Sequence, residues 1–179
     1  MPSITLYVFP SSLESMKATL AVRESALSNV RIDVVDMYRE VYTPRFIQLQ
    51  PSCTVPVLVM PDGRVLRSSA EIVHFAHNSY PMYSHLGQED NQELIREFCD
   101  LVALWDESNF SLGNPFASSR EALIESSVVK RIRLGAVRRN LMQYGRTDPG
   151  LAKKYLQLIE QLQKQDTKWE KRVEITLLS

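Results

Sequence analysis

The sequence has no long apolar run and no excess of charge of either sign. Its apolar stretches fall far short of the roughly 18 residues that a membrane-spanning helix needs. Lysine and arginine together number 21, as do aspartate and glutamate, so a net charge of zero gives no general attraction to nucleic acid or to a membrane surface. The first residues, Met1 to Thr5, carry no basic segment typical of a secretory signal. We therefore expect a cytoplasmic protein with neither a membrane nor a nucleic acid as its partner.

Cysteine and histidine are also scarce. The two cysteines, Cys53 and Cys99, are far apart and form no Cys-x-x-Cys pair, so we expect reduced thiols. His74 and His77 are three residues apart, but no third ligand or carboxylate is placed beside them. We therefore expect no bound metal ion.

What the sequence does contain, over its first 80 residues, is a series of short apolar runs separated by turn residues. Residues 4–9 and 30–37 are typical of strands, and residues 15–28 between them have apolar positions at helical spacing. This order predicts two parallel strands joined by a right-handed crossover. A short helix is expected over 42–49.

Residues 54–78 predict a strand, a turn, a second strand and a helix. The apolar run 54–59 has a proline at its mouth, where a residue without an N–H is tolerated. Asp62-Gly63 between two β-branched runs is a strong hairpin signal. Ser69 precedes the periodic apolar residues of a helix, as an N-cap residue does, and the helix should end near residue 78.

Beyond Pro81 the pattern is helical only. Amphipathic spacing predicts a first helix over 89–109, which contains Trp105. A capping box at Ser118 to Glu121 predicts a second helix that runs to about residue 144, and Asp148-Pro149 predicts the start of a third, followed by a tail after residue 169. We expect three segments: a domain over 1–80, a linker over 81–88 and a short all-helical domain over 89–179.

The stretch from Val55-Pro56-Val57-Leu58 through Asp62-Gly63 to Ile72 resembles the second half of the glutathione-binding domain of glutathione transferases. The resemblance covers roughly residues 3–80. It implies a thioredoxin-like α/β domain of order βαβ-α-ββα followed by an all-helical domain. It also implies that Pro56 is cis, that the Val55 backbone pairs with the cysteine of glutathione, and that Ser69 holds the γ-glutamyl carboxylate.

Two positions depart from the family pattern. Ser68 stands where the family usually has an acidic or amide residue that meets the glutamyl ammonium. Thr54 stands where it usually has a lysine, glutamine or histidine that holds the glycine end of glutathione. Both side chains can still form hydrogen bonds with the peptide, so both remain candidate binding residues.

Ser12 is the candidate catalytic residue. Serine-type members of the family place the active hydroxyl two residues after a proline, and Pro10-Ser11-Ser12 matches that register. A hydroxyl donor near a helix N-terminus favours a thiolate and lowers its pKa. Two alternatives remain: Ser12 is a plain helix cap, or Tyr7 supplies the hydroxyl. Ser15 stands where redox relatives carry a second cysteine, and because a hydroxyl forms no mixed disulfide, we exclude a glutaredoxin-like reaction.

The resemblance implies a transferase of detoxification type that uses glutathione as co-substrate against a small electrophile or peroxide. The alternative is a non-catalytic interaction module of the same fold, as in translation factors or scaffolds. A third and weaker hypothesis is binding of nucleic acid or an acidic partner through the basic residues 130–139. The helical part lacks the family's buried capping-box helix, so its apolar stripes at 94–105 and 151–162 favour a homodimer.

Overall fold

The computed structural model describes residues 3–25, 27–79, 93, 96–97, 101 and 120–177, with the backbone alone at 120–127 and 165–177. The expected linker 81–88 and Cys99 lie outside the described residues. So does most of the expected helix 89–109, including Trp105, although residues 93, 96, 97 and 101 are helical. In the described part of 90–165 the regular elements are all helices.

A four-stranded mixed sheet forms the centre of the N-terminal part, in the order β2-β1-β3-β4. Strand β1 (Ile4–Val8) runs parallel to β2 (Val30–Val34), and β3 (Val57–Val59) pairs antiparallel with both β1 and β4 (Val65–Leu66). The expected parallel pair and hairpin are both present. The sheet is therefore the thioredoxin-like arrangement that the resemblance implied.

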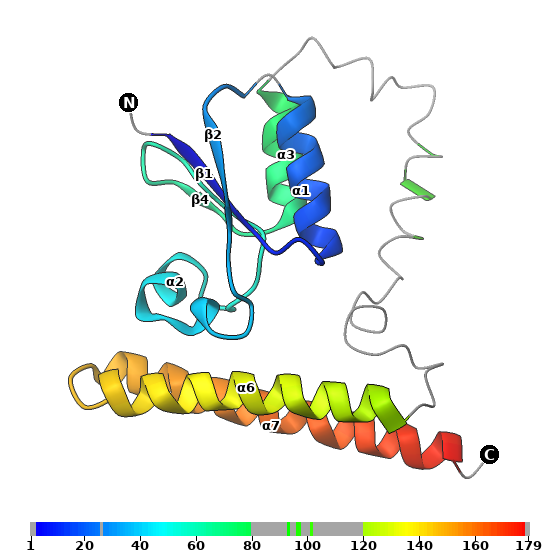
Figure 1. Cartoon of the computed structure of the whole chain (residues 1–179). Helices are drawn as coiled ribbons and strands as arrows, with labels where there is room; N and C mark the ends of the chain where they lie inside the picture. The colour runs from blue at the N-terminus through cyan, green and yellow to red at the C-terminus, as the bar shows by residue number, and fades with distance from the viewer. Residues whose placement is uncertain are drawn as a thin grey trace.

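Side chains alternate between the two faces of the sheet, and helices cover each face. Helices α1 (Leu13–Glu24) and α3 (Ser69–Asn78) lie side by side on one face (Figure 1). That face has a core built from three strand residues and three helix residues, namely Leu6, Val8, Leu58, Ala18, Val22 and Ile72. The cores of the two faces are separate, because Tyr7 and Val57 point to the other side.

The opposite face carries the 3₁₀ helix η1 (Glu40–Tyr42) and α2 (Pro44–Leu49). Two long helices, α6 (Arg120–Tyr144) and α7 (Pro149–Leu177), lie side by side beneath them (Figure 1). The Tyr42 carbonyl accepts hydrogen bonds from Asn140 Nδ2 at 2.9 Å and from the Tyr155 hydroxyl at 3.0 Å. These bonds tie the helical hairpin to the end of η1.

Several expected boundaries were wrong by a few residues, for local reasons. The strand 30–37 ends at Val34 because the Asp36 carboxylate turns the chain by accepting from the Tyr38 N–H at 2.7 Å. The helix expected over 42–49 is split at Thr43, which is extended because a proline follows it, and which caps α2. The helix expected over 15–28 runs from Leu13 to Glu24 because Ser12 is its cap.

The expected tail after residue 169 was also wrong, because α7 continues to Leu177 and is 29 residues long. No glycine or proline follows Gly150, so nothing in the sequence interrupts the helix. Its start was correct: Asp148 caps it, with the Leu151 N–H donating to Asp148 Oδ1 at 2.9 Å. None of the helices in the described ranges combines the length and apolar content needed to cross a membrane.

Candidate ligand-binding cleft

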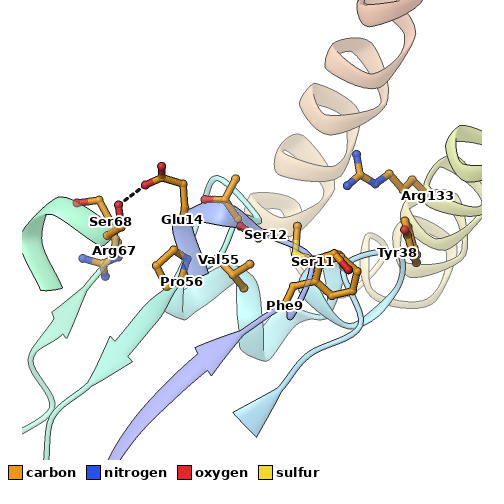
Figure 2. A pocket seen from close by; sticks show the side chains of 13 residues that line it. Phe9, Ser11, Ser12, Glu14, Tyr38, Val55, Pro56, Arg67, Ser68 and Arg133 are labelled. Carbon is orange, nitrogen blue, oxygen red and sulfur yellow. Dashed lines mark hydrogen bonds between the residues drawn. The ribbon is translucent and has the colours of Figure 1, made fainter. Parts of the chain in front are cut away.

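A cleft of about 570 Å³ lies where the N-termini of α1 and α3 meet the loop before β3 and one side of α6 (Figure 2). All six residues named from the sequence as candidate catalytic or glutathione-binding residues line it, namely Ser12, Thr54, Val55, Pro56, Ser68 and Ser69. The remaining lining residues are Phe9, Ser11, Glu14, Met37, Tyr38, Arg67 and Arg133.

Ser12 caps α1 and faces the cleft at the same time. Its N–H donates to the Phe9 carbonyl at 2.9 Å, and its Oγ accepts from the Ser15 N–H at 3.3 Å. The cap uses a lone pair of the oxygen, so the hydroxyl proton is still available to a ligand. The N-cap role and the role in ligand binding, which were alternatives at the sequence level, are therefore compatible.

Ser15 lies behind the cleft wall. Only 1% of its surface is exposed, and its Oγ accepts from the Phe9 N–H at 3.1 Å. Tyr7, the alternative hydroxyl, also lies outside the lining residues. Its ring packs edge-on against Phe46 and its hydroxyl accepts from Arg45 Nη2 at 3.3 Å. Ser12 is thus the one of these three hydroxyls that reaches the cleft.

The loop before β3 is held from inside the protein. The Val55–Pro56 bond is cis, as the resemblance implied. The buried Gln50 amide donates to Thr54 Oγ1 at 3.2 Å and to the Arg67 carbonyl at 2.9 Å. Gln50 therefore links the loop that carries Thr54 and Val55 to the chain that enters α3.

The N-terminus of α3 differs by one residue from the expectation. Ser68 is the N-cap, accepting from the Glu71 N–H at 3.1 Å, and Ser69 is the first helical residue. Ser69 is 6% exposed and donates its hydroxyl proton to the Glu14 carboxylate. The Ser69 hydroxyl, which was expected to bind a carboxylate of the ligand, is therefore already bound to the carboxylate of Glu14.

Glu14 was not identified from the sequence. Burial raises the pKa of its carboxyl, but hydrogen bonds from Lys17 and Ser69 and the charge of Lys17 outweigh that effect, so the pKa lies below its ordinary value. Lys17 Nζ is 2.6 Å from Glu14 Oε1. No local motif could reveal this residue, because its partner Ser69 is 55 positions away in the chain.

Arg67 and Arg133 were also missed. Arg67 lies on the strand-to-helix turn, where its Nε donates to the Leu49 carbonyl at 2.7 Å and its N–H donates to Glu71 Oε2 at 2.8 Å. Arg133 comes from α6, within the stretch of basic residues that the sequence analysis noted. Its place in the cleft depends on how the helical hairpin packs against the sheet, which no sequence pattern specifies.

The mixed sheet with α1 and α3 on one face, followed by a helical hairpin, defines a protein of the glutathione transferase fold. Residues 11–79 match the family model described as the glutathione S-transferase N-terminal domain. This part of the chain, less than half of its length, is therefore similar to the N-terminal domain of glutathione S-transferases. No curated protein sequence matches the chain.

Solved structures extend the likeness to the helical part. A glutathione transferase homologue from Sulfitobacter with bound glutathione has a TM-score of 0.55 and 18% identity, covering 97% of this chain and 90% of that one. A delta-class glutathione transferase from Nilaparvata lugens has a TM-score of 0.51 and 22% identity, covering 75% and 66%. Ure2p in complex with glutathione has a TM-score of 0.52 and 15% identity, covering 84% and 72%. At these identities the likeness is one of fold.

Proposed function

We propose that this chain is a glutathione transferase-like enzyme in which Ser12 activates the thiol of glutathione for attack on a small electrophile or peroxide. The observation that carries the proposal is the cleft itself. Ser12, with a hydroxyl proton to donate, lies at the N-terminus of α1, and Ser68 and Ser69 lie at the N-terminus of α3. All three serines line the same cleft. A thiolate at the first position and a carboxylate at the second would both be stabilised by the positive ends of the helices.

The chemistry follows from the ionisation of the thiol. A cysteine-like thiol has a pKa near ~8.5, so most of it is protonated at neutral pH. The Ser12 hydroxyl and the N-terminus of α1 favour the thiolate and so lower that pKa. The thiol proton passes to water, and the sulfur lone pair then forms the new bond to the electrophile. The electrons of the bond that breaks depart with the leaving group or, in an unsaturated electrophile, stay on the product, which takes up a proton. The enzyme supplies orientation and electrostatic stabilisation.

The glutathione itself would lie along the loop and the start of α3. The Val55 backbone beside Pro56 would pair with the peptide in β fashion, with Thr54 nearby. The γ-glutamyl end carries both a carboxylate and an ammonium. Ser68 and Ser69 would meet the carboxylate, and Glu14, the only acidic residue among the described residues that line the cleft, would meet the ammonium. Glu14 would thus replace the acidic or amide residue that the family usually has at position 68.

The test compares Ser12→Ala with Ser15→Ala in a thiol-conjugation assay, after the wild type is tested for retention on immobilised glutathione. Loss of one hydrogen bond to a thiolate is worth roughly 1.5–3 kcal/mol, so Ser12→Ala should lower the rate about 10- to 100-fold. Ser15→Ala should keep the activity per folded molecule and lose stability, because the Phe9 N–H loses its acceptor. Full activity in Ser12→Ala would contradict the role of Ser12.

A non-catalytic interaction module is the second candidate, and one observation favours it. The Ser69 hydroxyl is already engaged by Glu14, so a ligand carboxylate has to displace an internal one. If the wild type neither binds glutathione nor conjugates any electrophile, this second function replaces the first. The basic residues on α6 offer no comparable support, although Arg131, Arg138 and Arg139 are exposed.

A homodimer in the cytoplasm is part of the proposal. The sequence analysis offered the apolar stripe at 151–162 as a dimer surface. That expectation was wrong, because Tyr155, Leu158 and Leu162 are buried against their own chain. Exposed apolar side chains lie instead on α1, where Met16 and Leu20 are 53% and 62% exposed. Light scattering at tens of micromolar should give twice the chain mass of 20.5 kDa, and a monomer mass would overturn the dimer.

A further inference from the structure

The end of the cleft nearest α6 differs in chemistry from the end nearest α3. Its wall contains Phe9 and Tyr38, with Arg133 above them (Figure 2). The rings of Phe9 and Tyr38 meet edge to face at 6.1 Å, and Cζ of Arg133 lies 5.7 Å from the centre of the Tyr38 ring. Among the described residues, this end therefore offers an apolar, partly aromatic wall with Arg133 as its cation.

Arg133 lacks an anion within the part of the chain that the structure describes. Its Nε is buried without a hydrogen-bond acceptor, and none of the ion pairs between described residues involves it. The neighbouring phenol of Tyr42 is neutral: burial raises its pKa, although the charge of Arg133 opposes the rise. A buried guanidinium donor left without an acceptor is unfavourable, and a carboxylate matches its planar fork of N–H groups.

The position of Ser12 connects the two ends. Figure 2 shows Ser12 between Glu14 on one side and Tyr38 with Arg133 on the other. A molecule with its anion on Arg133 and its apolar body against Phe9 and Tyr38 would extend toward Ser12. That is where the proposed thiolate would form, so such a molecule would present its reactive carbon to the sulfur.

We propose that the α6 end of the cleft, formed by Phe9, Tyr38 and Arg133, is a subsite for an aromatic or unsaturated carboxylate, and that Arg133 selects for the negative charge. The proposal names the class of electrophile that the proposed transferase would use. It rests on that proposed function only for the reaction of the bound carboxylate with the glutathione thiolate. Binding itself requires Arg133 and the apolar wall, not glutathione.

The experiment is a calorimetric titration of the full chain, without glutathione, with 4-nitrobenzoate and with its neutral analogue 4-nitrobenzamide. Because hydrogen bonds to a charged group are worth more than neutral ones, the wild type should bind the carboxylate about 10-fold more tightly or better. Arg133→Gln should abolish this preference, and Arg133→Lys should retain part of it, since lysine keeps the charge without the planar fork. Arg138→Gln removes an exposed arginine from the same helix and should leave the preference unchanged.

Three outcomes overturn the inference: equal affinity of the wild type for the two compounds, no binding of either, or a preference that survives in Arg133→Gln. Far-UV circular dichroism and thermal unfolding identify any variant that fails to fold. If Arg133→Gln does not fold, the preference of the folded Arg133→Lys variant for the carboxylate over the amide tests the inference. A separate titration with glutathione tests the proposed function. A chain that prefers the carboxylate but ignores glutathione keeps this subsite and loses the transferase role.

Discussion

Ser12 and Ser15 are three positions apart, and burial gives their hydroxyls different tasks. Ser15 is enclosed and satisfies the Phe9 N–H, while Ser12 stays at the cleft with a proton to donate. Between them Glu14 points across to Ser69 on the other helix. At the start of α1, Ser15 thus holds the backbone at Phe9, Ser12 faces the cleft, and Glu14 contacts α3 through Ser69.

At this scale Glu14 gives the sharpest prediction. If it meets the glutamyl ammonium, Glu14→Gln should weaken binding of glutathione by about 10-fold, because a charge-assisted hydrogen bond becomes a neutral one. If Glu14 instead competes with the ligand carboxylate for Ser69, the same change should tighten binding. Isothermal titration at neutral pH separates the two results, and tighter binding would contradict the role proposed for Glu14. Lys17→Met, which removes the ion-pair partner but keeps the carboxylate, is the control.

Among the elements, the helix starts depend on their caps. Ser12, Thr43, Ser68 and Asp148 each accept from a backbone N–H in the first turn of the helix that follows. Cap, proline and turn residues act locally, so the order of elements could be predicted from the sequence, and the resemblance to glutathione transferases implied the cis proline. The Glu14–Ser69 contact and the approach of Arg133 could not, because they depend on the packing of segments far apart in the chain.

Ser68→Ala tests the correction at the start of α3. Loss of a serine N-cap typically costs about 1 kcal/mol, which for a chain of this size lowers the melting temperature by roughly 2–4 °C. Ser28→Ala, in an exposed turn, is the matched control and should leave the melting temperature unchanged. Differential scanning calorimetry measures both. An unchanged melting temperature in Ser68→Ala would mean that Ser68 contributes little as a cap.

For the whole molecule, the Tyr42 carbonyl is the point at which the helical hairpin is fixed to the sheet domain. Two side chains from different helices, Asn140 on α6 and Tyr155 on α7, donate to it. Tyr155 is completely buried. Burial, with smaller contributions from Tyr144, Cys53 and Asp148, raises the pKa of its phenol from 10.0 to about 12.

Tyr155→Phe should lower the free energy of unfolding by about 0.5–1.5 kcal/mol, because one hydrogen bond is lost while Asn140 still satisfies the carbonyl. The difference should depend on pH. The folded state holds the phenol proton more tightly than the unfolded state, so its contribution is complete below pH 10 and declines as the pH rises toward 12. Urea unfolding at pH 8, 10 and 11 should show the two proteins converging. Parallel curves over this range would mean that the phenol does not titrate differently on unfolding.

Cys53 lies one residue before the loop that lines the cleft, yet it faces the core: 5% of its surface is exposed and burial raises its pKa to about 11. Only the thiolate exchanges with disulfides, and at neutral pH this sulfur is almost wholly protonated. A cell's oxidised glutathione should therefore leave Cys53 unmodified in the folded protein. The Cys53 thiol therefore lies close to the proposed glutathione site without being a target of glutathionylation.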